Sequence, residues 1–409
     1  MITRLEIDGF KSLVGFELDV LPSLVLVGPN GAGKSNVFDA LRLVADCVDD
    51  KMERAFARQT RGHGPDLFHR TADGDPPPMR IVVGMLLATR FGPMAARIRL
   101  EAEWRNGELR PNRESSAVWF SSLEDRSWMR RLGLSPEWIA AIDDSARMLP
   151  PREGRHHRIG AGPIPGLLGH LIVQECQSWR PLELQPATMR DPVPGSGPDS
   201  DLLRPDGANL ALVLGRIQKA GSLDDLNVDL AALLPGIREV VPVFDRRRFE
   251  YDFDVVQRDG QRSAPVLLSE GTLRILALLA AAHDPHAPGL LAVEELENGL
   301  HPSRLAEVVR RLRRDVVEYH DAPPPTGPMR QLLMTTHSPV LVSAFRDAPD
   351  ATLVFVERST RYATGGGPGD QVTVARPVLA SPPPDADLGT YATDFEVRRL
   401  LETVPGGER

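Results

Sequence analysis

Residues 28–35 read GPNGAGKS and follow the apolar run SLVLV. Their spacing, G-x-x-x-x-G-K-[ST], is that of a phosphate-binding loop between a strand and a helix. Backbone N–H groups of such a loop surround phosphate oxygens, and the helix presents the positive end of its dipole to them. We expect Lys34 to bind the β- and γ-phosphates of a nucleotide and Ser35 to hold Mg²⁺. Further nucleotide contacts are expected from Asn30, Gly31, Gly33 and Asn36.

A second stretch, GLLAVEELENGLHP at residues 289–302, is an apolar run that ends in two carboxylates. Glu294 is expected to hold the Mg²⁺ and its water shell. Glu295 is placed to polarise an attacking water as a general base. The alternative is a strand end with ordinary solvated acids.

A third stretch, LLSEGTLRILALLAA at residues 267–281, places Ser269 and Gly271 where a loop turns into an apolar helix. The start of such a helix can bind a γ-phosphate. If the two sites lie on opposite flanks of one chain, this helix implies a partner subunit. The alternative is a serine that only caps its own helix.

Two further stretches carry weaker signals. LLMTTHSPVLV delivers His337 at the end of an apolar run, where open α/β sheets place ligands, although a structural histidine fits the same pattern. LEIDGFKSL places Lys11 and Ser12 in a turn between two strands, within reach of phosphates or ribose if it is not a plain surface turn.

Hydrophobic periodicity divides the chain into segments. Alternating strands are predicted before residue 30 and as an antiparallel pair over 79–105, and α/β alternation returns after residue 247. Between them lie helical patterns separated by Pro/Gly-rich breaks. The predicted divisions are an N-terminal part of the head over 1–105, an inserted, mainly helical lobe over 106–235, a C-terminal part of the head over 236–360, and a strand and tail over 361–409.

The composition excludes several classes of protein. The 409 residues carry a net charge of −8, so the surface as a whole does not attract nucleic acid. Two cysteines provide no disulfide framework, and the first residues do not resemble a signal peptide. No run of 18 apolar residues suggests a membrane span. We therefore expect a soluble, cytoplasmic protein with no membrane partner.

The order of these motifs resembles the ABC-type ATPases of the SMC/RecF class. It is closest to the compact AAA ATPases related to the overcoming-lysogenization-defect (OLD) family, over residues 1–105 and 236–358. The resemblance implies an α/β P-loop head with a mixed central sheet, an antiparallel β subdomain and an inserted helical lobe. It implies ATP and Mg²⁺ as cofactors, Glu295 and His337 as catalytic residues, Asn298 in the D-loop, and a signature that contacts the opposite subunit's ATP.

Departures from the family pattern affect three positions. Glu294 stands where an aspartate is usual, and Glu270 replaces the first glycine of the signature. The Q-loop has only a weak candidate, Gln59. OLD-type nucleases continue into a Toprim domain, and the remaining residues after the HSP element predict that this nuclease is lacking.

The resemblance implies an ATP-hydrolysing switch that works as a homodimer or higher oligomer. Its output would control a separately encoded effector, a nuclease or toxin, in anti-phage defence or DNA metabolism. A nucleotide-dependent scaffold or sensor with little turnover is the alternative, and a transporter subunit fits poorly. DNA is left open as a partner by the basic stretches at 152–158 and 245–250, whereas the one at 308–315 is better explained as a solvated helix face.

Overall fold

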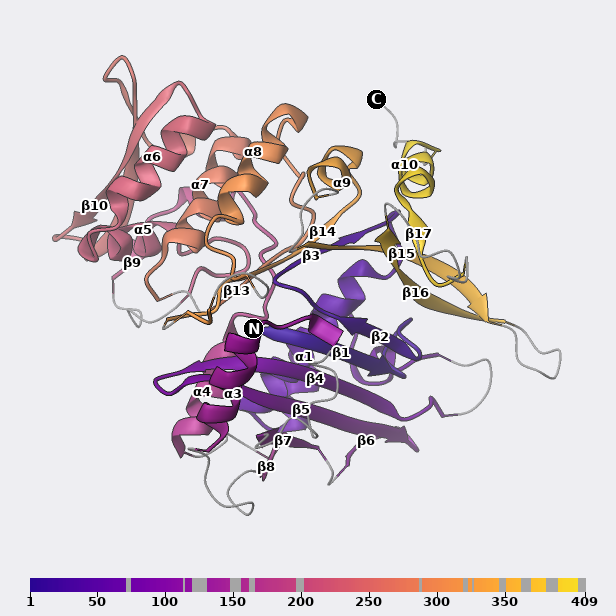
Figure 1. Ribbon diagram of the computed structural model, residues 1–409. Coiled ribbons are helices and arrows are strands. Elements are labelled where there is room, and N and C mark those ends of the chain that lie inside the picture. Colours follow the sequence, from indigo (N-terminus) through magenta and orange to yellow (C-terminus); the bar gives the residue numbers. More distant parts are fainter. Residues whose placement is uncertain are drawn as a thin grey trace.

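The computed structural model describes residues 1–70, 75–112, 115–119, 131–147, 156–161, 166–195, 202–286, 289–318, 323–325, 327–345, 351–361, 369–379 and 389–403. Within them, two larger sheets and one small sheet combine with helices into a layered α/β molecule (Figure 1). None of the described helices is long and apolar enough to span a bilayer.

The central sheet is mixed, as predicted, with strand order β13–β14–β3–β15–β16–β17. The first four strands run parallel, and β16 pairs antiparallel to β15. Parallel strands covered on both faces are apolar along their whole length, which explains the continuous runs SLVLV and QLLMTT. The strands are β3 (Ser23–Val27), β13 (Leu290–Val293), β14 (Gln331–Thr336), β15 (Ala351–Arg361), β16 (Asp370–Leu379) and β17 (Ala392–Thr393).

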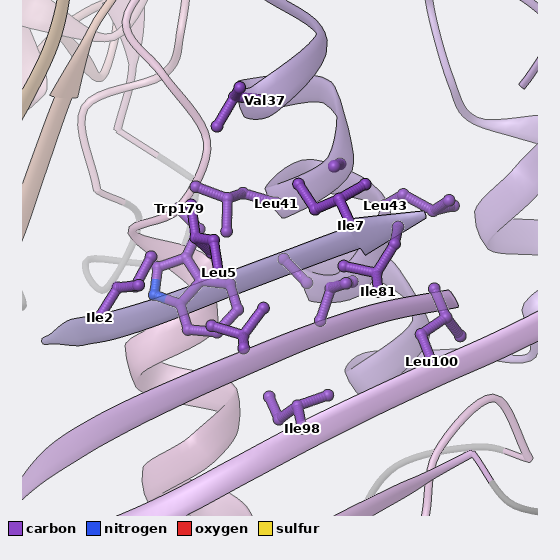
Figure 2. Packing of buried hydrophobic residues seen from close by; sticks show 14 of the residues in the cluster. Ile2, Leu5, Ile7, Val37, Leu41, Leu43, Ile81, Ile98, Leu100 and Trp179 are labelled. Carbon is purple, nitrogen blue, oxygen red and sulfur yellow. The ribbon is translucent and has the colours of Figure 1, made fainter. Parts of the chain in front are cut away.

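The second sheet is antiparallel and has the order β2–β1–β4–β5–β7–β8, with β6 paired to β5. Helix α1 (Lys34–Asp49) lies between it and the central sheet, so one apolar cluster contains side chains of both sheets. Figure 2 shows Leu5, Ile7, Ile81 and Ile98 of this sheet packing toward Leu41 of α1. The strands are β1 (Ile2–Asp8), β2 (Phe16–Asp19), β4 (Met79–Thr89), β5 (Gly92–Arg105), β6 (Glu108–Pro111), β7 (Ser116–Trp119) and β8 (His156–Arg158).

A helical layer covers the other face of the central sheet. Leu24 and Leu26 of β3 join the cluster around α1, whereas Val25 and Val27 join the cluster of the helical layer. A small sheet (β9, β10, β11, β12) borders this layer. The helices of the layer are α5 (Leu210–Lys219), α6 (Leu223–Leu233), α7 (Glu270–His283), α8 (Pro302–Leu312) and α9 (Pro339–Phe345). The strands of the small sheet are β9 (Val193–Pro194), β10 (Ile237–Asp245), β11 (Glu250–Gln257) and β12 (Arg262–Ser263).

The segment predicted as one inserted lobe, residues 106–235, is shared between these layers. Strands β6, β7 and β8 extend the antiparallel sheet, and α4 packs on α1, whereas α5 and α6 belong to the helical layer. Helical periodicity shows which face of a helix is buried but not what covers it, so the sequence pattern could not assign these pieces. The remaining elements are α2 (Met52–Ala57), α3 (Pro136–Ala146), α4 (Gly166–Gln177), α10 (Asp394–Thr403) and the 3₁₀ helices η1 (Gly64–Leu67), η4 (Thr188–Arg190) and η5 (Pro265–Leu267).

Candidate functional site

The phosphate-binding loop follows β3 and opens directly into α1. The central position of β3, between β14 and β15, places the loop at the carboxyl end of the parallel strands. Two of its glycines are required by close approach. A Cβ on Gly28 would lie 2.1 Å from the carbonyl oxygen of Val356, and one on Gly33, whose φ is +103°, would lie 2.0 Å from Thr373 Oγ1. The loop is therefore packed tightly on its own chain.

Lys34 is folded back onto this loop. Its Nζ donates to the carbonyl oxygens of Gly28 at 2.7 Å and Pro29 at 3.0 Å. Burial lowers the pKa of Lys34, and the nearby Glu295, Glu297 and Glu294 oppose that shift. Phosphate oxygens carry negative charge, so the Lys34 ammonium group would form stronger hydrogen bonds with them than with the two neutral loop carbonyls.

Glu294 lies just beyond β13 and faces the start of α1. Ser35 Oγ donates to Glu294 Oε2 at 3.4 Å, so the structure brings the two predicted metal ligands together. Their hydroxyl and carboxylate oxygens are hard donors of the kind that Mg²⁺ takes beside waters and substrate phosphates. The residues present therefore fit this ion.

Arg61 donates hydrogen bonds to both oxygens of the Glu294 carboxylate. Its two terminal nitrogens lie 3.3 and 2.9 Å from the two oxygens of Glu294, and it also pairs with Glu183 at 3.1 Å. Burial raises the pKa of Glu294, and Arg61 counteracts that shift. The guanidinium thus neutralises the same carboxylate that is expected to hold the metal.

Glu295 has an unusual backbone conformation. Its φ is +47°, its N–H donates to Thr335 Oγ1 at 2.9 Å, and its Oε2 accepts from Asn298 Nδ2 at 2.6 Å. Positive φ is uncommon for residues other than glycine and is concentrated at functional sites. The hydroxyl of Thr335 on β14 thus holds the predicted general base in a sharp turn beyond the sheet.

His337 is held by a carboxylate that the sequence interpretation did not single out. Its backbone N–H donates to Glu297 Oε1 at 2.6 Å, and its ring Nδ1 lies 2.9 Å from the same oxygen. The other oxygen of Glu297 is buried without a hydrogen-bond partner among the described residues. Buried polar atoms are normally satisfied, so this exception next to the expected switch histidine marks Glu297 as part of the site.

Lys11 and Ser12 occupy the edge of the loop. Lys11 Nζ pairs with the buried Asp39 of α1 at 2.6 Å. A chain of hydrogen bonds runs from Asn36 Nδ2 to Ser12 Oγ (2.8 Å), onward to Thr373 Oγ1 (2.5 Å), and from there to the carbonyl of Ala32 (3.0 Å). Thr373, on β16, thereby braces the phosphate-binding loop.

Ser269 and Gly271 lie at the start of α7, where Ser269 is exposed and Gly271 is half-buried. Ser269 Oγ accepts from Thr272 N–H at 3.2 Å and caps α7, and a Cβ on Gly271 would lie 2.8 Å from the carbonyl oxygen of Gly299. Among the described residues, no hydrogen bond joins them to the phosphate-binding loop. The preceding Val266 and Leu267 are 66% and 74% exposed.

Sequence interpretation missed several residues of the site: Arg61, Glu183, Glu297, Thr373, Thr335 and Asp39. Only Glu297 carried a local signal, a carboxylate two positions after Glu295. Gln59, the Q-loop candidate, is buried and donates to Asp46 and to the carbonyl of Ala55, so it does not face Glu294 here. A cavity of about 1410 Å³ lies between α4 and the start of β13, and none of the predicted site residues line it.

The β-strand, glycine loop and helix on a mixed sheet define a P-loop NTPase, and the family match that follows supports the predicted SMC/RecF-like class of ABC-type ATPases. A family model described as "AAA domain, putative AbiEii toxin, Type IV TA system" matches residues 23–145 and 171–343. These segments are more than half of the chain, which therefore belongs to this AAA family.

Three of the solved structures that the comparison found are SMC head domains. A head bound to the C-winged helix domain of ScpA has 16% identity and a TM-score of 0.45, covering 91% of this chain and 98% of its own. The head from Thermotoga maritima has 15% identity and a TM-score of 0.41 at the same coverage. A head with an extended coiled coil, bound to the C-terminal domain of ScpA derived from Pyrococcus furiosus, has 14% identity, a TM-score of 0.44 and coverage of 92% and 96%. Among curated proteins the comparison found no match.

Proposed function

We propose that this protein is a cytoplasmic ATPase whose two copies close face to face on ATP and separate after hydrolysis. One observation carries the proposal. The phosphate loop, Ser35 and Glu294 meet within one chain, whereas Ser269, among the described residues, forms no hydrogen bond with them and follows the exposed Val266 and Leu267. A second copy that supplies its Ser269 turn would complete the pocket and bury this apolar surface at once.

The chain's own residues have separate roles in this proposal. Lys34 would leave its loop carbonyls for the β- and γ-phosphates, and Ser35 with Glu294 would hold Mg²⁺, which supplies charge neutralisation when bound. Glu295 would accept a proton from the attacking water, with Asn298 orienting its carboxylate. Glu297 would position His337 toward the γ-phosphate.

The test compares wild-type protein with Glu295→Gln. We expect wild-type protein to release phosphate from ATP·Mg²⁺ and to shift to a dimer transiently. Glu295→Gln should keep nucleotide affinity, lose about 100-fold or more in turnover, and remain a dimer, because general bases contribute on this scale. Light scattering after size exclusion measures assembly, and a phosphate sensor measures turnover.

Two outcomes would contradict parts of the proposal. If ATP neither is hydrolysed nor changes the assembly state, the switch is refuted. If ATP assembles dimers but wild type and Glu295→Gln release phosphate equally slowly, the protein is a nucleotide-dependent scaffold.

We further infer that the switch controls a separately encoded effector, a nuclease or toxin, in phage defence or DNA metabolism. The name of the matched family, which refers to a toxin of a toxin–antitoxin system, supports this direction. Affinity purification of Glu295→Gln from its native host, with ATP and with ADP, tests it. A partner retained only with ATP is the expected result, and equal recovery in both states would contradict nucleotide control.

A further inference from the structure

The hairpin formed by β10 and β11 ends in the sequence VFDRRRF, residues 243–249. Asp245 Oδ1 accepts hydrogen bonds from the backbone N–H groups of Arg247 at 2.8 Å and Arg248 at 3.2 Å, which fixes the turn. Figure 1 shows β10 at the outer edge of the helical layer, on the opposite side of the molecule from β16 and α10. The turn is therefore a rigid, outward-facing element distant from the C-terminal strands.

Aromatic rings gather on one face of this hairpin. Phe244 and Tyr251 are directly opposite each other in the strand register, and their ring centroids lie 4.7 Å apart. Phe249 packs edge-on to Phe244 at 5.4 Å. Phe244 and Phe249 are nonetheless 39% and 54% exposed, which is high for large apolar side chains. The rings support one another and still present surface to solvent.

Cations surround these rings. The three consecutive arginines, Arg246, Arg247 and Arg248, are all exposed. Among the described residues, no carboxylate lies within ion-pairing distance of their guanidinium groups. Lys219, at the end of α5, donates to the Tyr251 hydroxyl at 2.7 Å and lies 5.2 Å above its ring. The turn next to the rings thus carries three arginines, with Lys219 nearby, and one carboxylate, Asp245, whose pKa is lowered by the backbone N–H groups of Arg247 and Arg248 and by the charge of Arg248.

The acids of the hairpin face the other way. Glu250, Asp252 and Asp254 alternate with Tyr251 and Phe253 along β11. Successive side chains of a strand point to opposite faces, so these carboxylates lie across the hairpin from Tyr251 and Phe244. These three carboxylates therefore do not neutralise the positive charges on the side of the hairpin that carries Phe244.

The arginines in helix α8 and just after it differ from those of the hairpin, because they pair with carboxylates. Arg310 pairs with Glu307, and Arg311 and Arg314 both pair with the buried Asp229. Those arginines are neutralised within the chain, and Arg311 is itself largely buried, so this stretch is not simply a solvated helix face. The hairpin arginines have no such partners in the described part of the chain.

We propose that residues 244–249, with Lys219, form a binding site for single-stranded nucleic acid in which the buried Tyr251 supports the exposed rings of Phe244 and Phe249 from below. Exposed rings offer faces on which unpaired bases stack, and the guanidinium and ammonium groups match the phosphates between them. A duplex presents the phosphates but keeps its bases stacked on each other, so it satisfies the charges and leaves Phe244 and Phe249 exposed. The geometry therefore favours single strands over duplexes.

The same hairpin leads into the signature turn. β11 continues through β12 and η5 to Ser269. We infer that binding at the tip is transmitted along β11 to this turn, which in the proposed function completes the partner's ATP site. This coupling rests on the proposed function, whereas the binding itself does not.

Fluorescence anisotropy without nucleotide tests the binding separately from ATP chemistry. The probes are labelled oligo-dT of about 20 nucleotides and a mixed duplex of the same length, titrated between about 50 and 300 mM salt. We expect saturable binding with a preference for the single strand. Arg246→Ser/Arg247→Ser/Arg248→Ser should flatten the plot of log affinity against log salt by about 2, because each phosphate contact in a single strand contributes roughly 0.7.

A ring-deleting variant separates stacking from charge. Phe249→Leu keeps an apolar side chain and should weaken oligo-dT binding by about fivefold or more without changing the salt slope, since base stacking contributes at this level. The matched control is Arg147→Ser/Arg238→Ser/Arg310→Ser. It removes the same charge from three exposed arginines, each paired with a neighbouring carboxylate, and should bind as wild type does.

Specific results would overturn the proposal. They are the absence of saturable binding by thermally stable wild-type protein, an equal loss in the control triple variant, or equal affinity for polyglutamate or anionic phospholipid vesicles. Binding that survives in a protein without ATPase activity would support the site and count only against the proposed switch.

Discussion

The two halves of the proposed ATP site differ in how far one chain completes them. Around the phosphate-binding loop, Lys34, Ser35 and Arg61 all find partners within the chain. Around the signature turn, Ser269 does no more than cap its own helix, and Leu267 beside it is 74% exposed. Buried, mutually bonded groups can hold a site rigidly before a ligand arrives, whereas an exposed turn with apolar neighbours is suited to contact another molecule. In the proposed function, the first half therefore binds the nucleotide and the second half responds to it.

The largest expected effect breaks the first half. Lys34→Ala should lower affinity for a fluorescent ATP analogue by about 100-fold, because hydrogen bonds from a charged group to phosphate are lost. Equilibrium fluorescence titration measures the affinity. Lys51→Ala, which removes an exposed lysine from the start of α2, is the control and should bind as wild type does. Wild-type affinity in Lys34→Ala would refute the assignment of this loop.

A charged side chain beside the signature turn should leave nucleotide binding intact but prevent ATP-dependent dimerisation and turnover. Leu267→Glu should keep nucleotide affinity within about twofold and reduce ATP-dependent dimerisation and turnover about tenfold or more, since a carboxylate would be desolvated at the interface. Light scattering and phosphate release measure the two effects. Val228→Glu alters a similarly exposed apolar residue, 67% exposed on α6, and should change neither. Equal effects of the two substitutions would remove the distinction between the halves.

Arg61 provides a further test of the half around the phosphate-binding loop, because its guanidinium forms hydrogen bonds with both oxygens of Glu294. Arg61→Ala leaves Glu294 and Glu183 facing each other without that cation. We expect the free energy of unfolding without Mg²⁺ to fall by about 1 kcal/mol and Mg²⁺ to restore much of the loss. Thermal unfolding with and without Mg²⁺ checks this, with Arg58→Ala, which pairs with Asp50, as the control. A loss that Mg²⁺ does not change would show that Arg61 is only structural.

The smallest expected effect concerns Thr373 on β16, whose hydroxyl supports the phosphate-binding loop. Thr373→Val removes the hydroxyl that joins Ser12 to the carbonyl of Ala32. The free energy of unfolding should fall by about 1 kcal/mol, with a few-fold loss of nucleotide affinity, because a buried acceptor loses its partner. Denaturant unfolding and fluorescence titration measure these values. Thr373→Ser keeps the hydroxyl and should restore both, and failure to do so would mean that methyl packing matters more than the bonds.

Much of the fold followed from local patterns. The all-buried runs of β3 and β14 and the glycine loop before α1 are short-range features, and the phosphate-binding loop was predicted from them, whereas the mixed sheet was implied by the family resemblance. The fate of residues 106–235 was not, because a buried helix face is compatible with either side of a sheet. The meeting of Ser35 and Glu294, separated by 259 positions, was expected from family order rather than from periodicity.

The sequence by itself determined the chemistry that this protein carries: a lysine and a serine after a glycine loop, and carboxylates after an apolar strand. Residue types and short spacings are enough for that, since each motif is a continuous segment. Only the tertiary structure decided that Arg61 covers Glu294, that Glu297 holds His337, and that the arginines of the β10–β11 turn have no carboxylate partner among the described residues. Side chains distant in sequence meet through packing of layers, and no local pattern records which charges that packing neutralises.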